Sequence, residues 1–156
     1  MGSGLNIGNS EARELEPPPS PVKPQQTIHP QGIPAMMTIA ILDAFAAAWN
    51  RHDIDALMSH MTDDCIFESS AGPEATGTRF QGHNAVRAGY KAVWQSIPDA
   101  KWNNPTHFIS GDRGLSQWTF TGTRPDGTAI EVTGCDVFTF RGDKIEVKNS
   151  YRKMRG

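Results

Sequence analysis

Apolar residues recur at helical spacing in three segments of the chain, and most of the remaining apolar residues follow a strand-like pattern. From Thr38 the pattern predicts a helix that ends near Asn50–Asp53, and a second short helix follows before Asp63. A third helix is predicted from about His83 to Ile97, because Pro98 cannot continue it. The apolar positions are Ile41, Leu42, Phe45, Ala48 and Trp49 in the first helix, Ile54, Leu57, Met58 and Met61 in the second, and Val86, Tyr90, Val93, Trp94 and Ile97 in the third.

The remaining apolar runs predict β-strands. One strand, Cys65–Ser69, precedes a loop rich in Gly, Thr and Pro from Ala71 to Gly82. The order ααβαββββ predicts an α+β fold, with three helices packed on one face of a curved antiparallel sheet of four to five strands. The four strands after the third helix are expected at 101–110, 115–124, 128–140 and 144–153. The predicted core contains Phe45, Phe67, Val86, Trp118, Val132 and Phe138.

The N-terminal segment differs from this pattern. The first 35 residues hold seven of the eleven prolines and almost no large apolar side chains. Such a segment cannot offset its ordering entropy by burying apolar surface. We therefore predict a disordered, Pro-rich tail over residues 1–36 and a single domain over residues 37–156.

Composition narrows the class of protein. The formal net charge is −2 and the basic residues are scattered, so we do not expect nucleic-acid binding. We find no apolar segment of membrane-spanning length and no signal-peptide pattern, which predicts a cytoplasmic protein with no membrane partner. The two cysteines, Cys65 and Cys135, lie in predicted strands without metal-ligand spacing, and we expect both to be buried, reduced thiols.

The best candidate for a functional residue is Asp136. Side chains alternate along a strand, so Asp136 shares a face with Phe138 and Phe140. A carboxyl group on an apolar face must be paired, hydrogen-bonded or protonated, and such groups collect at catalytic and binding sites. The alternative is a core aspartate that a neighbouring hydroxyl or amide satisfies.

Turn chemistry predicts which residues surround this aspartate. The Pro-Asp-Gly turn at 125–127 brings Trp118 opposite Gly134 and Ser116 opposite Asp136. This register places the large apolar side chains of the hairpin on one face, whereas a slip by one residue would move Trp118 to the other face. The small Gly134 is expected to leave space beside Asp136.

Two registers are possible for the last hairpin. A two-residue Gly-Asp turn places Asn149 opposite Asp136 and brings Tyr151 onto the same face. Asn149 and Tyr151 would then be hydrogen-bond donors beside a neutral Asp136 acid. If a three-residue bulge forms instead, Lys148 and Ser150 lie beside the aspartate, and the Lys148 cation favours its anion.

Further residues are candidates for the same site. His107 is a possible second titrating group, although a strand histidine is more often a surface or half-buried polar group. Glu68 alternates with the apolar Phe67, which places it on the outer face by default. Aromatic residues predict a ligand-binding pocket, although they could equally be core filling: Trp49, Phe67, Tyr90, Trp94, Trp118 and Phe138.

The residues together resemble a known superfamily. The resemblance covers about Thr38 to Lys153 and is to the cone-shaped, cystatin-like nuclear transport factor two-like fold, nearest to SnoaL-like polyketide cyclases and ketosteroid-isomerase-like proteins. It rests on Trp49-Asn50-Arg51-His52-Asp53, Asp63-Asp64-Cys65-Ile66-Phe67-Glu68, Asp136-Val137-Phe138-Thr139-Phe140 and Lys144-Ile145.

The resemblance implies roles for individual residues. Asp136 is in the place of the protonated aspartic acid of a ketosteroid isomerase oxyanion hole. Ser69 stands where such isomerases have a catalytic aspartate, and Phe45 stands where they have a tyrosine. The resemblance also implies a homodimer through the outer sheet face, and the residues near the contact would be Thr133, Val137 and Thr139.

Two functions of different classes follow. The chain has no metal motif, nucleophile elbow, phosphate loop or dinucleotide fingerprint, so we expect chemistry without a cofactor. The first hypothesis is an acid/base enzyme of the isomerase, cyclase, dehydratase or epoxide-hydrolase type, acting on a small apolar or cyclic substrate. Its candidate catalytic residues are Asp136, Asn149, Tyr151 and His107. The second hypothesis is a non-catalytic ligand-binding or dimerisation module.

Overall fold

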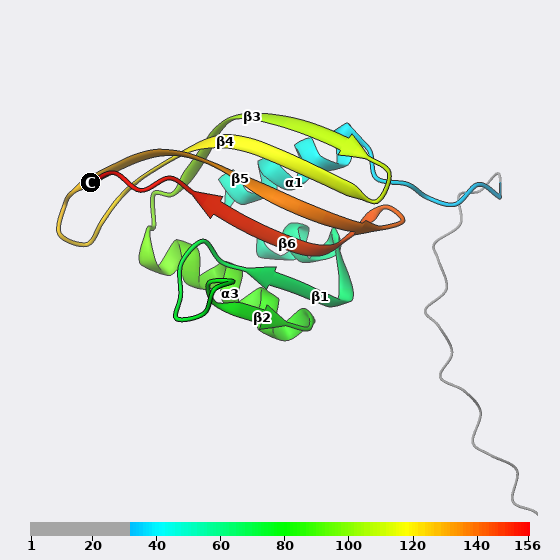
Figure 1. Ribbon diagram of the computed structural model, residues 1–156, viewed down its shortest axis with the longest axis horizontal. Helices are drawn as coiled ribbons and strands as arrows, with labels where there is room; N and C mark the ends of the chain where they lie inside the picture. The colour runs from blue at the N-terminus through cyan, green and yellow to red at the C-terminus, as the bar shows by residue number, and fades with distance from the viewer. Residues whose placement is uncertain (1–31) are drawn as a thin grey trace, which may run out of the picture.

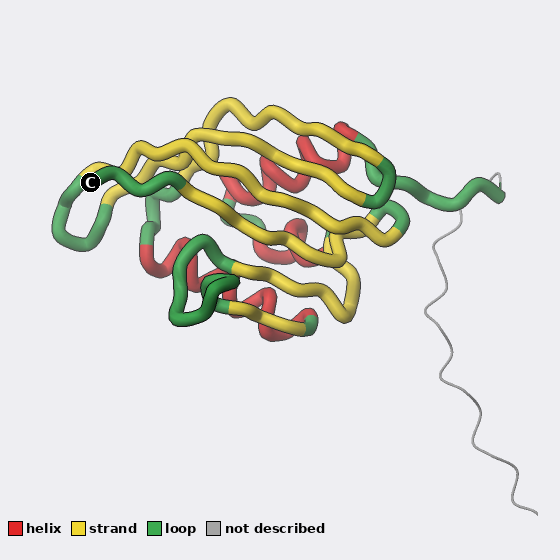
Figure 2. Tube along the Cα trace, viewed as in Figure 1, coloured by secondary structure: helices red, strands yellow, loops and turns green. Residues whose placement is uncertain are grey.

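Strands form one side of the molecule and helices the other (Figures 1 and 2). The structure is a computed structural model that describes residues 32–156. The helices are α1 (Ile39–Arg51), α2 (Ile54–Ser59) and α3 (His83–Ser96). The strands are β1 (Met61–Glu68), β2 (Arg79–Gln81), β3 (Lys101–Ser110), β4 (Arg113–Thr123), β5 (Ala129–Arg141) and β6 (Lys144–Arg152).

Local signals set the ends of α1. The Thr38 side chain accepts a hydrogen bond from the Ile41 amide at 3.2 Å and caps the first turn. The helix ends at His52, which adopts a left-handed conformation with φ of 55°. The residues that α1 buries are Leu42, Phe45, Ala48 and Trp49, as the helical spacing predicts.

The sheet is mixed, and the prediction of an antiparallel sheet was wrong in this respect. The six strands have the order β2-β1-β6-β5-β4-β3, and β1 runs parallel to β6 while the other pairs are antiparallel. Strands β3 to β6 follow one another as a meander, whose last strand lies beside β1 in the same direction. The short strand β2, which pairs with β1, lies inside the segment predicted as a loop. Because β1 and β2 precede α3, only two of the three helices come before the sheet in the chain.

The β4–β5 hairpin has the predicted register. Trp118 lies opposite Gly134, and Ser116 lies opposite Asp136. The Arg124 amide donates to the Thr128 carbonyl at 2.9 Å and closes the turn. The structure therefore confirms the strand register that the apolar pattern and the turn type predicted.

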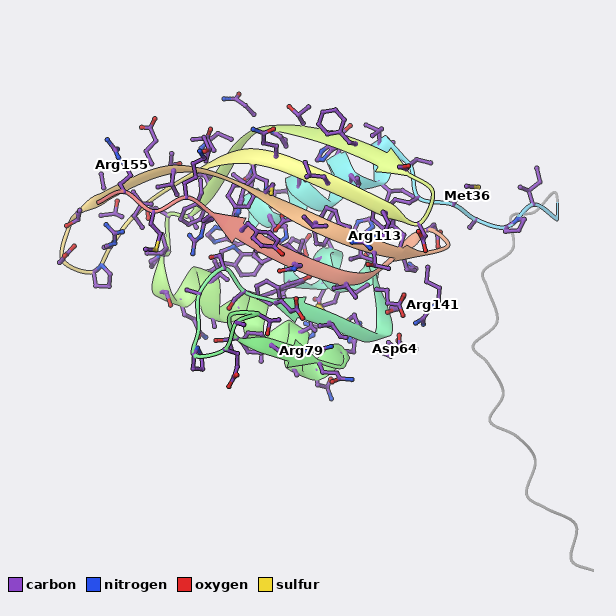
Figure 3. All side chains as sticks on the ribbon, viewed as in Figure 1. Met36, Asp64, Arg79, Arg113, Arg141 and Arg155 are labelled. Carbon is purple, nitrogen blue, oxygen red and sulfur yellow. The ribbon has the colours of Figure 1, made fainter. Side chains whose placement is uncertain are left out.

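The β5–β6 hairpin departs from the preferred register. The two-residue turn forms as predicted and pairs Phe140 with Ile145, but the next pair is Thr139 with Val147. Glu146 is therefore an extra residue, a β-bulge that moves every later side chain of β6 to the opposite face. Its carboxylate accepts a hydrogen bond from Arg141. Arg141 also binds both oxygens of Asp64 on β1, at 2.9 and 3.0 Å (Figure 3).

The main core lies between the helices and the inner face of the sheet. Five of the six predicted core residues are buried, and Val132 is only partly buried. Val132 lies opposite Phe120 and packs against a second, smaller cluster formed by Ala100, Trp118 and Phe120. Cys65 is buried as predicted, whereas Cys135 is partly exposed because its side chain lies on the outer face of the sheet.

The predicted Pro-rich tail falls mainly on residues that the structure does not describe. Residues 1–31 are outside the described part of the chain, so the tail stays a prediction. Met37, at the predicted start of the domain, is buried against the main core. None of the helices between residues 32 and 156 is long and apolar enough to cross a membrane.

Candidate functional site

Strand β5 places the Asp136 carboxylate on the inner face of the sheet, where it is 5% exposed. Its two oxygens have different partners. Oδ1 accepts hydrogen bonds from Ser150 Oγ at 2.6 Å and lies 2.8 Å from Lys148 Nζ. Oδ2 accepts a hydrogen bond from Trp118 Nε1 at 3.0 Å. The buried carboxyl group is thus paired and hydrogen-bonded, as burial of a charge requires.

Lys148 makes this group an ion pair. Lys148 as a whole residue is 4% exposed. The Lys148 ammonium also donates a hydrogen bond to Ser150 Oγ at 2.7 Å. It lies 5.0, 4.8 and 5.8 Å from the ring centres of Trp49, Phe67 and Tyr90, within the range of cation–π attraction. Burial lowers the pKa of Lys148, and the carboxylate of Asp136 opposes this effect.

The expectation of a neutral Asp136 acid belonged to the register that does not form. With an ammonium 2.8 Å away, the carboxylate is the favoured form. Tyr90 is different, because burial and the Asp136 charge both raise its pKa well above the ordinary value. The Tyr90 hydroxyl therefore stays neutral, and it contacts the sulfur of Met61 at 3.4 Å.

A small cavity lies between α1 and strands β3 to β5, with Asp136 in its wall. Its volume is about 20 Å³, enough for about one water molecule. Pro105 is its exposed edge, next to Asn104, which has a positive φ of 53° at an irregularity of β3. The lining residues are Leu42, Phe45, Ala46, Trp49, Trp102, Pro105, Ser116, Trp118, Asp136 and Phe138.

Gly134 does not leave the expected free space beside Asp136. A side-chain carbon added at Gly134 would lie 2.6 Å from the ring of Trp118 and would also clash with the Tyr151 carbonyl. The indole of Trp118 therefore occupies this space, and glycine is needed there for the ring to reach Asp136.

The structure corrects the placement of Asn149 and Tyr151. Both side chains lie on the outer face, where Asn149 Nδ2 donates to the Tyr151 hydroxyl at 2.9 Å and Tyr151 is 54% exposed. The bulge at Glu146 is the reason, since it exchanges the two faces of β6. Lys148 and Ser150 occupy the positions beside Asp136, as in the second register considered from sequence.

His107 is on the inner side, and its side chain is only 2% exposed. Its Nδ1 atom lies 2.6 Å from the hydroxyl of Ser116, its partner across β3 and β4. Its Nε2 atom lies 3.1 Å from Oδ1 of Asp43 on α1. The prediction singled out His107 but neither of these partners. Asp43 gave no signal because it lies on the polar side of the helical pattern.

The aromatic candidates divide into three groups. Trp49, Trp118 and Phe138 line the cavity, whereas Phe67 and Tyr90 lie around the Lys148 ammonium. Trp94 is half-buried and packs behind Trp49, with ring centres 5.3 Å apart. The aromatic cluster is therefore partly a cavity wall and partly core.

Other polar candidates lie apart from the cavity. Glu68 lies on the opposite side of β1 from Phe67, and its carboxylate is 3.8 Å from Arg79. Ser69 donates to the Ala71 carbonyl in the loop that follows β1. No group of three or more His, Cys, Asp or Glu side chains that could hold a metal ion occurs in the described range 32–156.

Several solved structures have the same fold. A candidate polyketide cyclase from Pseudomonas putida has a TM-score of 0.68 and 17% identity, over 77% of this chain and 94% of that chain. A protein with a ketosteroid isomerase-like fold from Catenulispora acidiphila, in complex with trimethylamine, has a TM-score of 0.65 and 20% identity, over 74% and 86%. TerC, co-crystallised with polyporic acid, has a TM-score of 0.63 and 21% identity, over 74% and 90%.

At these identities the likeness establishes the fold and not the activity. No curated protein sequence matches the chain. The profile of the SnoaL-like domain matches residues 42–147, which include most of α1, the whole of β1 to β5 and Asp136. The chain therefore belongs to the SnoaL-like domain family.

Proposed function

We propose that this protein is a cofactor-independent acid/base enzyme for a small, apolar or cyclic substrate. Asp136 is the base in this proposal. The observation that carries it is a buried carboxylate, held as an anion by Lys148, in the wall of a cavity whose other lining is almost entirely apolar. The ion pair keeps the carboxylate deprotonated and fixed in the cavity wall, so that it can accept a proton from a substrate in the cavity.

Trp49 supports the presence of a ligand. It lines the cavity and is buried, yet its indole N–H has no hydrogen-bond partner among the residues that the structure describes. A buried donor without a partner costs about 1–3 kcal/mol. A carbonyl or hydroxyl oxygen of a bound substrate would satisfy this donor. The structural neighbours bound to trimethylamine and to polyporic acid show that this fold accommodates small organic molecules.

The volume of the cavity favours a second function, a non-catalytic module that dimerises rather than binds a ligand. Ligand pockets commonly have 300–1,000 Å³, whereas the space beside Asp136 has about 20 Å³. Catalysis and ligand binding both require the cavity to widen between α1 and β3. Pro105 and Ala46 are at this boundary, one on each element. In the second function, the ion pair only anchors the polar network of the core.

The test is proton exchange on a small ketone. Cyclopentanone in D2O is incubated with the protein, and loss of its α-proton signal is followed by NMR. We expect exchange above the buffer background for the wild type. The base is removed together with its cation, in the variant Asp136→Asn/Lys148→Met, because Asp136→Asn alone would leave the Lys148 ammonium buried without its partner.

The double variant should fold and lose the catalysed exchange by about 100-fold or more. Asp63→Asn, which removes an exposed carboxylate of β1, is the matched control and should exchange at the wild-type rate. Equal rates for the wild type and the double variant would reject catalysis by Asp136 and favour the non-catalytic module.

A further inference from the structure

A second group of polar side chains reaches the Asp136 cavity from the side of α1 and β3. Ser116 lines the cavity and lies opposite Asp136 across β4 and β5. Its hydroxyl lies 2.6 Å from Nδ1 of His107, and Nε2 of His107 lies 3.1 Å from Oδ1 of Asp43. The Asp43 side chain is 64% exposed, whereas Ser116 is buried. The three side chains thus connect solvent with the cavity wall.

The geometry fixes how the protons of His107 are arranged. The contact of Nε2 with Asp43 is close but is not aligned as a hydrogen bond, and Nε2 has no hydrogen-bond partner within residues 32–156. A carboxylate at this distance favours a proton on Nε2. Nδ1 then faces Ser116, from which it accepts a hydrogen bond when unprotonated and to which it donates one when protonated.

We propose that Asp43, His107 and Ser116 form a proton-transfer path into the cavity, so that the site has an acid opposite its base. This inference rests on the proposed function, since it assigns the acid that complements Asp136. Ser116 is the catalytic residue that touches the substrate. His107 supplies the proton, and Asp43 is a positioning residue that holds the ring by its charge.

The proposed step conserves protons and electron pairs. Asp136 takes a proton from the carbon next to a carbonyl, and the electron pair of that C–H bond forms a C=C bond while the carbonyl π pair moves to oxygen. The oxygen takes the proton of Ser116, and Ser116 takes the Nδ1 proton of His107. The products are an enol, a neutral Asp136 and a neutral His107 that keeps its Nε2 proton beside Asp43. Return of the proton from Asp136 to a different carbon, with reversal of the other transfers, completes an isomerisation.

The path predicts a dependence on the His107 ring that a structural role would not produce. Among the described side chains, the titratable group that contacts the His107 ring is Asp43 from α1, and the contact from β4 is the hydroxyl of Ser116. Because Ser116 must regain its proton from Nδ1, a side chain that keeps this hydrogen bond but cannot pass on a proton should not support catalysed exchange.

The test variants change the hydroxyl of Ser116, the ring of His107 and the carboxylate of Asp43. Ser116→Ala should lower the catalysed exchange of cyclopentanone by about 100-fold, the usual effect of losing a donor to a developing oxyanion. Ser116→Thr keeps the hydroxyl and should restore most of the rate. His107→Asn keeps an N–H donor near the position of Nδ1 but cannot pass on a proton, so it should lower the exchange by about as much as Ser116→Ala does. Asp43→Asn should reduce the rate by up to about fivefold, as for an exposed ion pair.

The possible outcomes separate this inference from the proposed function. If Ser116→Ala exchanges at the wild-type rate while the Asp136/Lys148 double variant does not, the path is wrong and Asp136 remains the base. If the wild type does not exceed the buffer background, both proposals are wrong. Should Ser116→Ala fail to fold, a wild-type rate of exchange in His107→Asn would still overturn the path.

Discussion

At the scale of single residues, the Asp136–Lys148 pair has both an energetic cost and a chemical use. Removing two charges from water costs several kcal/mol per ion, and their attraction offsets this only with good geometry and further hydrogen bonds. Here Ser150 and Trp118 supply these bonds to the carboxylate. Such a pair adds little net stability, but it fixes a carboxylate in an apolar environment.

The variant Lys148→Met tests this balance. It leaves the Asp136 carboxylate buried without its cation, and we expect the free energy of unfolding to fall by about 3–5 kcal/mol. In Asp136→Asn/Lys148→Met both charges are absent, and most of this loss should be recovered. Urea denaturation of the wild type, both single variants and the double variant gives the coupling energy. Additive losses would show that the two side chains do not interact.

Cys65 predicts a pH dependence of stability. Burial raises the pKa of the Cys65 thiol from 9.0 to about 11. The unfolded chain therefore loses this proton at lower pH than the folded chain does, and the contribution to stability is complete below pH 9 and is lost as the pH rises to about 11.

The complete loss amounts to about 3 kcal/mol, since the pKa rises from 9.0 to about 11 and each pKa unit corresponds to about 1.4 kcal/mol. The measurement compares unfolding free energies at pH 8 and 10.5 for the wild type and Cys65→Ala, and the difference between the two slopes isolates this thiol. Cys135→Ala is the comparison variant: burial and the Asp136 charge raise the pKa of Cys135 too, but this thiol is partly exposed, so a smaller change of slope is expected. Equal slopes for the wild type and Cys65→Ala would contradict the prediction.

At the scale of elements, the bulge in β6 decides the chemistry of the site. The turn between β5 and β6 pairs Phe140 with Ile145 on the regular pattern, and the extra Glu146 then exchanges the faces of the strand. Without the bulge, Asn149 and Tyr151 would face Asp136. With the bulge, the Lys148 ammonium faces it.

Deletion of Glu146 tests the role of the bulge. We expect it to destabilise the fold by at least about 3 kcal/mol, because Asp136 would lose Lys148 and Ser150 together. Glu146→Ala is the control that keeps the residue count and removes only the contact with Arg141, at a cost of about 1 kcal/mol or less. Circular dichroism during denaturation measures both. A deletion as mild as Glu146→Ala would mean that the bulge does not set the register.

At the scale of the whole molecule, no helix of residues 32–156 covers the outer face of the sheet (Figure 2). A groove of about 340 Å³ lies on this side of the molecule, and Phe108 and Tyr151 are 59% and 54% exposed. The residues that line the groove are Leu115, Gln117, Thr133, Gly134, Cys135, Tyr151, Arg152 and Lys153. An uncovered sheet face with apolar side chains favours association with a second copy.

We predict a homodimer through this face, with Thr133, Val137 and Thr139 near the contact. Light scattering at micromolar concentration should give the mass of a dimer for the wild type and of a monomer for Val137→Lys. Glu74→Lys, in the exposed loop before β2, is the control and should stay dimeric. A monomeric wild type would reject the prediction.

Local patterns in the sequence were sufficient to predict the helices, the β4–β5 hairpin and the face on which Asp136 lies, because these depend on local periods and turn types. Apolar residues at helical spacing define α1, and alternation places Asp136 beside Phe138 on the inner face. The parallel pairing of β1 with β6 is a contact between distant segments, which no local pattern encodes.

The polar groups that meet at the site, in contrast, follow from packing between distant segments. A single extra residue in β6 replaced Asn149 by Lys148 beside the aspartate, and the energies of the two registers differ by contacts that form only when the sheet closes. The approach of Asp43 to His107 likewise depends on how α1 crosses β3. Side-chain direction follows from the local pattern, whereas the identity of the neighbour across an interface is fixed by packing.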